Sequence, residues 1–187
     1  KSAIEIYDNQ LFAVPFTDEA SVENVIHCLI LMLSMDIPSA EIRQRVSRLR
    51  PISMRLELKE GVNKCYIIDD TYNNDLVGLT IALNFLSQQE QRSQKIAILS
   101  DLLQTGQKEE DLYCQINTLL TQKGVQKLIA IGEAFARNAH VISIEASYFA
   151  TTDAFLSKLS LDSFEDALLL IKGARTFQFE RIVHRLQ

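Results

Sequence analysis

Polar side chains follow three apolar runs of the sequence, at the points where buried strands would end. The three segments are IIDDTYNND (67–75), ILSDLLQTG (98–106) and LLIKGARTF (169–177). In open α/β sheets, ligands bind in the crevice beyond the carboxyl ends of the strands, so polar groups placed there are candidates for a binding site. The carboxylates and amides of the first two segments suit polar ligands, and the cations of the third suit an anion.

The first segment carries more oxygen atoms than a helix cap requires. Successive side chains of a strand point to opposite faces, so only one of Asp69 and Asp70 is expected to face the crevice. Asn74 or Asp75 is expected to cap the helix that follows. Asp70 and Asn73 are left as candidate ligand groups.

The other two segments each allow a structural alternative. Ser100 and Asp101 could bind a ligand or could equally cap a short helix. Lys172 and Arg175 place two cations beside a glycine, which indicates an anion site, with a solvated turn as the alternative. Arg55 lies on an expected strand near the start of this region, where it could also be an ordinary surface arginine.

Several signatures of a self-sufficient enzyme are absent from the sequence. It contains neither GxGxxG nor GxxxxGK[ST], so it lacks a phosphate-binding loop of its own. It also lacks GxSxG and HExxH. The histidines and cysteines are scattered, without metal-ligand spacing. We therefore predict no catalytic residue and no metal site within these residues.

The composition limits the possible partners. The chain has 187 residues, 47% of them hydrophobic, enough for one full core and part of a second. A net charge of -5 argues against a broad basic face for nucleic acid. Three separated cysteines favour a reducing, cytoplasmic setting. The longest apolar run, at 28–35, is too short to cross a membrane.

Two regions differ in their hydrophobic pattern. Residues 1–50 are expected to contain a strand at 11–16 and helices at 17–35 and 40–49, too little for an independent domain. From residue 51 onward, strands alternate with helices, which predicts an α/β domain with a mainly parallel sheet and flanking helices.

The expected elements of the second region follow from these runs, and residues 133–150 are ambiguous. The first two strands should form a hairpin, and the later strands are continuous apolar runs typical of burial on both faces. The strands are expected at 54–59, 64–69, 95–99, 127–131 and 167–171, and the helices at 75–88, 109–122, 151–159 and 177–186.

In four segments that come in the right order, the chain resembles the C-terminal part of a MurF-type Mur ligase. The segments are PISMRLE, DDTYNND, LSDLLQTG and LLIKGARTFQFERIV. They resemble the family's arginine-bearing strand, its acidic-Tyr-Asn-Ala-Asn-Pro loop, its LGDM-x-ELG segment and its final LVKGSR strand. Residues 17–35 are similar to the helix that closes the family's central ATPase domain.

The resemblance implies a domain plan and an activity. Residues 1–50 would be the remnant of the central ATPase domain, and residues 51–187 the Rossmann-like C-terminal domain. The activity would be ATP-dependent addition of D-Ala-D-Ala to UDP-N-acetylmuramoyl-tripeptide in peptidoglycan synthesis. ATP and Mg²⁺ would be bound mainly by the missing central domain, so this chain would be inactive alone and would act with the rest of the ligase.

The resemblance also assigns residues to two groups. The nucleotide would contact Asn24, Arg55, Asp70, Tyr72 and Asn73. The incoming substrate would contact Asp101, Lys172 and Arg175.

The sequence departs from the family pattern at several positions. Asp75 and Leu76 stand where the family has Asn-Pro, Ala174 replaces a serine, and Ala20 and Ser21 replace a His-Asn pair. These departures resemble the branch in which the ligase is fused to an alanine racemase. Two alternatives stay open, a folylpolyglutamate synthase-like ligase domain and a non-catalytic α/β binding module.

Overall fold

The computed structural model divides the chain into two compact units, residues 1–52 and 53–187, which are described separately. The structure describes residues 2–6, 10–16, 19–50, 55–103 and 106–187.

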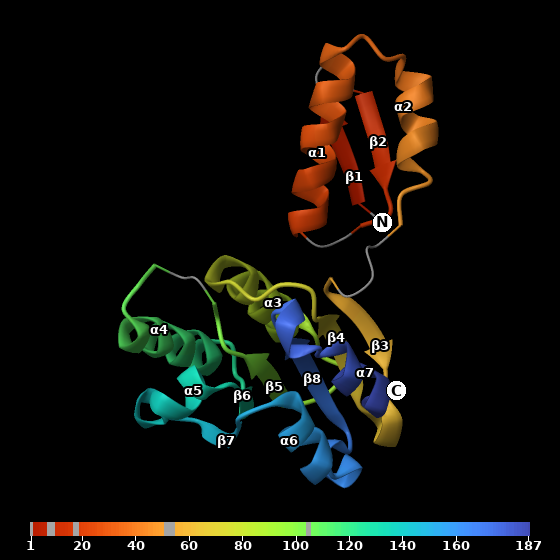
Figure 1. Cartoon of the computed structure of the whole chain (residues 1–187). Coiled ribbons are helices and arrows are strands. Elements are labelled where there is room, and N and C mark those ends of the chain that lie inside the picture. Colours follow the sequence, from red (N-terminus) through yellow and green to blue (C-terminus); the bar gives the residue numbers. More distant parts are fainter. Residues whose placement is uncertain (1, 7–9, 17–18, 51–54, 104–105) are drawn as a thin grey trace. The chain divides into compact units, whose positions relative to one another are not determined.

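The first unit is a two-stranded antiparallel hairpin with two helices (Figure 1). Its elements are β1 (Ser2–Ile6), β2 (Gln10–Val14), α1 (Glu19–Ser34) and α2 (Ser39–Val46). The strand and both helices expected here are present, and β1 is an additional strand. Its small core consists of Ile4, Phe12, Val14, Val25, Leu29, Ile42 and Val46.

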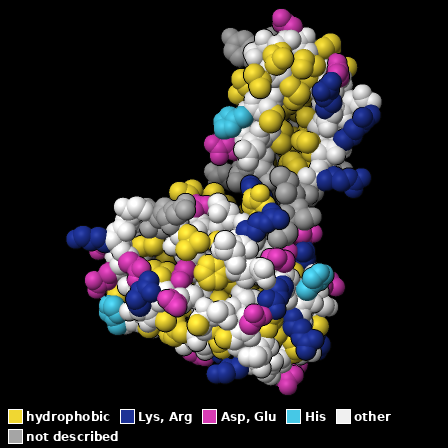
Figure 2. Space-filling view, viewed as in Figure 1, with side chains coloured by type: hydrophobic (Ala, Val, Ile, Leu, Met, Phe, Trp, Pro, Cys, Tyr) yellow, Lys and Arg dark blue, Asp and Glu magenta, His cyan; other side chains and the backbone are white. Residues whose placement is uncertain are grey.

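Large hydrophobic side chains also remain on the surface of this unit. Figure 2 shows hydrophobic side chains gathered on the face of this unit that is in view. Among the described residues of the unit, the exposed large hydrophobic side chains are Leu11, Ile30, Leu31, Met35 and Leu49. So few elements cannot enclose all their apolar side chains.

The second unit is built on a six-stranded sheet in the order β3-β4-β8-β5-β6-β7. β3 runs antiparallel to β4, and the other neighbouring strands are parallel. The predicted α/β class with a mainly parallel sheet is therefore confirmed. The strands are β3 (Glu57–Glu60), β4 (Tyr66–Asp70), β5 (Gln94–Ser100), β6 (Lys127–Ile131), β7 (Glu145–Phe149) and β8 (Ala167–Lys172).

Helices cover both faces of this sheet (Figure 1). Helices α3 (Leu76–Gln88), α4 (Glu109–Gln122) and α5 (Glu133–Arg137) contribute to the core on one face. Helices α6 (Thr152–Lys158) and α7 (Glu180–Leu186) contribute to the core on the other. Every residue of β8 is buried, as expected of a continuous apolar strand between two layers of helices.

The ambiguous segment from 133 to 150 contains α5, a single helical turn and the edge strand β7. The side chains of β7 are exposed or half-buried, so its sequence EASYF lacks the apolar run that marks the central strands. The last helix begins at Glu180, later than expected, because a short turn at 175–177 ends in Gln178, whose φ is +53°.

None of the helices in the described ranges is long and apolar enough to span a membrane. Acidic and basic side chains are interspersed on the face of the second unit shown in Figure 2.

The layered core predicts a large difference between two leucine substitutions. Leu83 on α3 is fully buried, so Leu83→Ala should lower the free energy of unfolding by about 2–5 kcal/mol through lost burial and a cavity. Leu58 on β3 is 39% exposed, so Leu58→Ala should cost no more than about 1 kcal/mol. Urea denaturation of both variants provides the measurement, and equal losses would contradict this packing.

Candidate functional site

The carboxyl ends of β4, β8 and β5 lie side by side, and the chain leaves them toward different faces of the sheet. After β4 and β5 it continues into α3 and α4, and after β8 into α7 on the opposite face. Loops that separate in this way leave a crevice at the strand ends, where α/β proteins bind ligands. All three polar segments singled out in the sequence meet at this edge.

A buried ion pair joins the ends of β4 and β8. Asp70 and Lys172 are opposite each other in the parallel register. The Lys172 Nζ donates to Asp70 Oδ2 at 2.6 Å and to the Asn73 carbonyl oxygen at 2.8 Å. Lys172 is only 3% exposed, so its charge is largely committed to the protein itself.

Burial raises the pKa of the Asp70 carboxyl above its ordinary value. The Lys172 ammonium, a backbone hydrogen bond from Leu56 and the Arg55 guanidinium all act in the opposite direction. Desolvation therefore outweighs the ion pair at this carboxylate.

A second set of hydrogen bonds joins the segments at the ends of β4, β5 and β8. The Asn74 side-chain amide donates to the Ser100 carbonyl oxygen at 2.7 Å, and the Ala174 N–H donates to Ser100 Oγ at 2.9 Å. Asn74 is 3% exposed, and its Oδ1 has no hydrogen-bond partner among the described residues. The three loops are thus held together by groups from each.

The carboxylates of Asp69 and Asp70 have different partners, because successive side chains of a strand point to opposite faces of the sheet. Asp69 Oδ2 accepts from the Lys59 ammonium at 2.7 Å, and Asp69 Oδ1 accepts from the Thr71 hydroxyl at 2.8 Å. Asp70 instead pairs with Lys172. The expected helix cap is Asp75, whose Oδ1 accepts from the Gly78 N–H at 2.8 Å.

Tyr72 brings together two arginines from distant parts of the sequence. The guanidinium carbon of Arg55 lies 5.0 Å from the centre of the Tyr72 ring, and that of Arg175 lies 5.6 Å from it. Both distances are within the range of a cation–π interaction. The family resemblance implies that Arg55 contacts the nucleotide and Arg175 the incoming substrate, whereas the structure places both beside the Tyr72 ring.

Asp101 caps a helix rather than presenting a free carboxylate. Its oxygens accept hydrogen bonds from the N–H groups of Ala134 and Phe135, both at 2.9 Å, and from the Tyr113 hydroxyl at 3.1 Å. Burial and the nearby Asp101 charge raise the pKa of Tyr113. A role for Asp101 in binding substrate stays a prediction, and three of its acceptor positions are already occupied.

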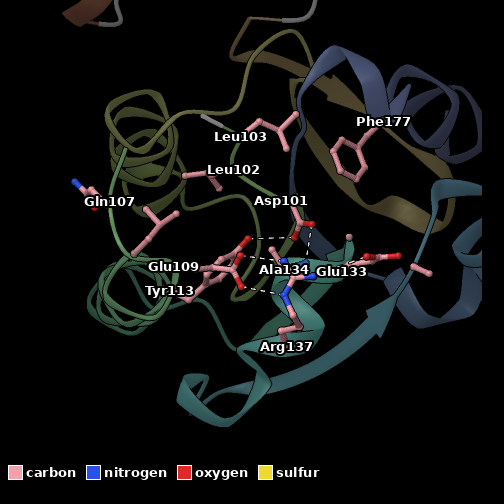
Figure 3. Close-up of a pocket in the computed structure, with 13 residues that line it drawn as sticks. Asp101, Leu102, Leu103, Gln107, Glu109, Tyr113, Glu133, Ala134, Arg137 and Phe177 are labelled. Carbon is pink, nitrogen blue, oxygen red and sulfur yellow. Dashed lines mark hydrogen bonds and ion pairs between the residues drawn. The ribbon is translucent and has the colours of Figure 1, made fainter. Parts of the chain in front are cut away.

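A pocket of about 480 Å³ lies beside Asp101 (Figure 3). Tyr113, Glu109, Arg137 and Phe177 also contribute to its lining. Glu109 and Arg137 form an ion pair at 2.9 Å, and Arg137 together with Asn138 lowers the pKa of Glu109.

The sequence predictions did not include the segment after β6, where helix α5 supplies Glu133 and Arg137 to this pocket. The sequence does indicate this part of the pocket, because IGEAFAR has a glycine and charged residues directly after an apolar strand, as the three polar segments do.

The remaining predicted residues are Asn24 and Asn73. Asn24 is an exposed residue of α1 in the first unit. Asn73 is exposed, and its side chain bonds to the Asn74 N–H and to Asp75 within its own loop. No group of three or more metal-ligating side chains occurs in the described part of the chain.

Comparison with known proteins confirms the resemblance to MurF-type ligases. The chain is 22% identical to the UDP-N-acetylmuramoyl-tripeptide–D-alanyl-D-alanine ligase of Escherichia coli over 179 residues, covering 93% of this chain and 38% of the relative. It is also 22% identical to the Bacillus subtilis enzyme of the same name, covering 94% of this chain and 39% of the relative. The chain thus spans about two fifths of these curated relatives. No protein-family model matches it.

Solved structures share the fold. A crystal structure of MurF from Acinetobacter baumannii matches with a TM-score of 0.76 at 20% identity, over 95% of this chain and 40% of the other. A folylpolyglutamate synthase from Mycobacterium tuberculosis, complexed with ADP, matches with a TM-score of 0.64 at 9% identity, over 93% of this chain and 42% of the other.

Removing the buried cation should destabilise the second unit strongly. Lys172→Met leaves Asp70 buried without its partner, so the free energy of unfolding should fall by about 3–5 kcal/mol. Arg181 and Asp153 form an ion pair of the same 2.6 Å length at the surface, so Arg181→Met should cost less than about 1 kcal/mol. Chemical denaturation measures both, and similar losses would contradict the buried role of Lys172.

The raised pKa of Asp70 predicts a pH dependence of known sign. The folded state binds the Asp70 proton more tightly than the unfolded state does, so the contribution of Asp70 to stability falls as pH rises through the two pKa values. The difference in unfolding free energy between the unsubstituted protein and Asp70→Asn should therefore decrease from about pH 3 upward. Chemical denaturation of both proteins across this acidic range measures the difference. A difference that increases with pH would show that folding lowers the pKa of Asp70.

Proposed function

We propose that this chain is the C-terminal part of a MurF-type ligase, an ATP-dependent enzyme that joins D-Ala-D-Ala to UDP-N-acetylmuramoyl-tripeptide in the cytoplasm. The observation that carries the proposal is similarity to ligases of that name over 93% of the chain. The crevice at the ends of β4, β8 and β5 supports it, because the motifs shared with the family form that crevice.

The domain plan is part of the proposal. Residues 1–50 would belong to the central ATPase domain, whose other elements would cover the hydrophobic side chains exposed in this unit. Residues 51–187 would be the Rossmann-like C-terminal domain. The coverage of 38% of the relative's length supports this plan, since it leaves room for the other domains of such a ligase.

The chemistry assigns separate tasks to the domains. ATP would phosphorylate the tripeptide carboxylate, and the dipeptide amine would attack the resulting acyl phosphate to give an amide and phosphate. By the family resemblance, ATP and Mg²⁺ would be bound mainly by the central domain. This chain would supply groups that close over the phosphates and the incoming dipeptide and exclude water.

The roles of individual residues follow the same division. Arg55, Tyr72 and Asn73 are exposed in the second unit and are available to a nucleotide. Asp70 and Lys172 would position the loops through their buried ion pair, in place of direct contact with ligand. Asn24 would contact the nucleotide from the first unit.

The departures at Asp75, Leu76 and Ala174 support placing the ligase in the branch fused to an alanine racemase. In this chain Asp75 caps α3, because its Oδ1 accepts from the Gly78 N–H at 2.8 Å.

Phosphate release by the longer ligase chain tests the proposal. Release should require ATP, Mg²⁺, UDP-N-acetylmuramoyl-tripeptide and D-Ala-D-Ala together, because the acyl phosphate forms on one substrate and is consumed by the other. Omitting either substrate should reduce release to the background rate. Release that is independent of both substrates, or absent with all four present, would contradict the proposal.

A second candidate is a folylpolyglutamate synthase-like ligase, favoured by the TM-score of 0.64 to such an enzyme. The same assay distinguishes it when a folate and glutamate replace the two peptidoglycan substrates. Release with that pair alone would identify the second candidate, and release with neither pair would favour a non-catalytic binding module.

A further inference from the structure

The hydroxyl of Ser100 bonds to all three segments that meet at the carboxyl ends of β4, β5 and β8. It accepts hydrogen bonds from the Ala174 N–H at 2.9 Å and from the Asn74 side-chain amide at 3.3 Å, and it donates to the Asp101 carbonyl oxygen at 3.0 Å. A hydroxyl has one donor and two acceptor positions, so all of them are used. Ser100 is also fully buried, and its hydroxyl therefore acts within the protein.

Asn74 holds Ser100 by a further bond. Its side-chain amide also donates to the Ser100 carbonyl oxygen at 2.7 Å, so Asn74 contacts both the backbone and the side chain of Ser100. The Oδ1 of Asn74 is buried and has no hydrogen-bond partner among the described residues. A buried acceptor without a partner lowers stability. The Asn74 side chain therefore suits a positional role better than a stabilising one.

The three positions joined by these bonds all differ from the family motifs that their segments resemble. Asn74 stands where Tyr-Asn-Ala-Asn-Pro has alanine, Ser100 where LGDM has glycine, and Ala174 where KGSR has serine. In the family pattern the hydroxyl is on the segment after β8, whereas in this chain it is at the end of β5. Three departures that meet at one hydroxyl indicate a coupled change of the three positions.

We propose that Ser100 is a positioning residue of the ligase and that Asn74 keeps it in place. Its hydroxyl fixes the backbone of Asp101 and of Ala174, which precedes Arg175 in the sequence. The family resemblance assigns both Asp101 and Arg175 to the incoming substrate, so Ser100 would act on that substrate through them. The set of Asn74, Ser100 and Ala174 is called the serine lock below.

The substrate that the serine lock affects rests on the proposed function, in which it is the incoming dipeptide. The lock itself can be measured without ligase activity, through exchange of the Ala174 amide hydrogen in the 187-residue chain. Failure of the ligase assay and failure of the serine lock are therefore distinguishable.

Hydrogen exchange of the Ala174 amide, followed by NMR, tests the serine lock. Ser100→Ala removes the acceptor of this amide, so its exchange should become about tenfold faster or more. Asn74→Ala does not remove that acceptor but should also accelerate the exchange, because Ser100 loses the bonds that hold it. Ser87→Ala is the matched control, since the Ser87 hydroxyl bonds locally within α3, to the Asn84 carbonyl oxygen at 2.8 Å. It should leave exchange at Ala174 unchanged within about twofold.

Steady-state kinetics of the longer ligase test the positioning role. Ser100→Ala should raise the KM for D-Ala-D-Ala about fivefold or more, because the segments of Asp101 and Ala174 lose their shared hydrogen-bond partner. The KM for ATP should change by less than about twofold. A purely structural role would reduce the amount of active enzyme, and so the apparent kcat, while leaving both KM values unchanged.

The coupling within the serine lock is tested by moving the hydroxyl to the position that the family pattern gives it. Ser100→Gly alone and Ala174→Ser alone should each raise the KM for D-Ala-D-Ala. The triple variant Asn74→Ala, Ser100→Gly and Ala174→Ser has the family residue at all three positions. Its KM should return to within about threefold of the value for the unsubstituted ligase.

Three results would overturn the proposal. The first is exchange of the Ala174 amide that is as slow in Ser100→Ala as in Ser87→Ala. The second is an unchanged KM for D-Ala-D-Ala in an active Ser100→Ala ligase. The third is a KM in the triple variant that shows the losses of the single variants added together. If the longer chain has no ligase activity, the proposed function fails, and the exchange experiment alone decides whether the serine lock exists.

Discussion

The buried ion pair between Asp70 and Lys172 is the contact on which the crevice of the second unit depends. It joins neighbouring strands whose partners are 102 residues apart in the sequence. A buried pair of this kind adds little net stability over apolar packing, because both charges lose their hydration. Its role is geometric, since the Lys172 ammonium on β8 bonds both to Asp70 at the end of β4 and to the Asn73 carbonyl in the following loop.

The same pair distinguishes the buried cation of this region, Lys172, from the exposed arginines. A lysine at the end of a central strand invites assignment as an anion ligand, but burial forces it to find a carboxylate within the protein. The arginines lie outside this buried layer, on a ring supplied by the adjacent loop. The site thus has an inner layer that fixes the loops and an outer layer of two exposed arginines beside the Tyr72 ring.

The sequence predicted the central strands and their helices well, because runs such as ALLLI have few alternatives to burial between two helical layers. The edge strand β7 lies in the segment 133–150, which the sequence left ambiguous, since EASYF carries no such run. The three polar segments meet at one edge of the sheet, as the sequence predicted, and the motif resemblance to MurF-type ligases is confirmed. Contacts between different strand ends could not be predicted, because they depend on the order of the strands in the sheet, which no local sequence pattern contains. Examples are the capping of α5 by Asp101 and the placement of Arg55 and Arg175 beside one ring.

That strand order has a consequence for how the second unit folds. β8 is the last strand in the sequence, yet it lies between β4 and β5 and pairs with both. These two earlier strands cannot complete the centre of the sheet until β8 is inserted between them, so much of the folding barrier involves contacts distant in sequence. A nascent or truncated chain without β8 would leave two strand edges exposed to other chains, which makes aggregation during synthesis the characteristic hazard of this topology.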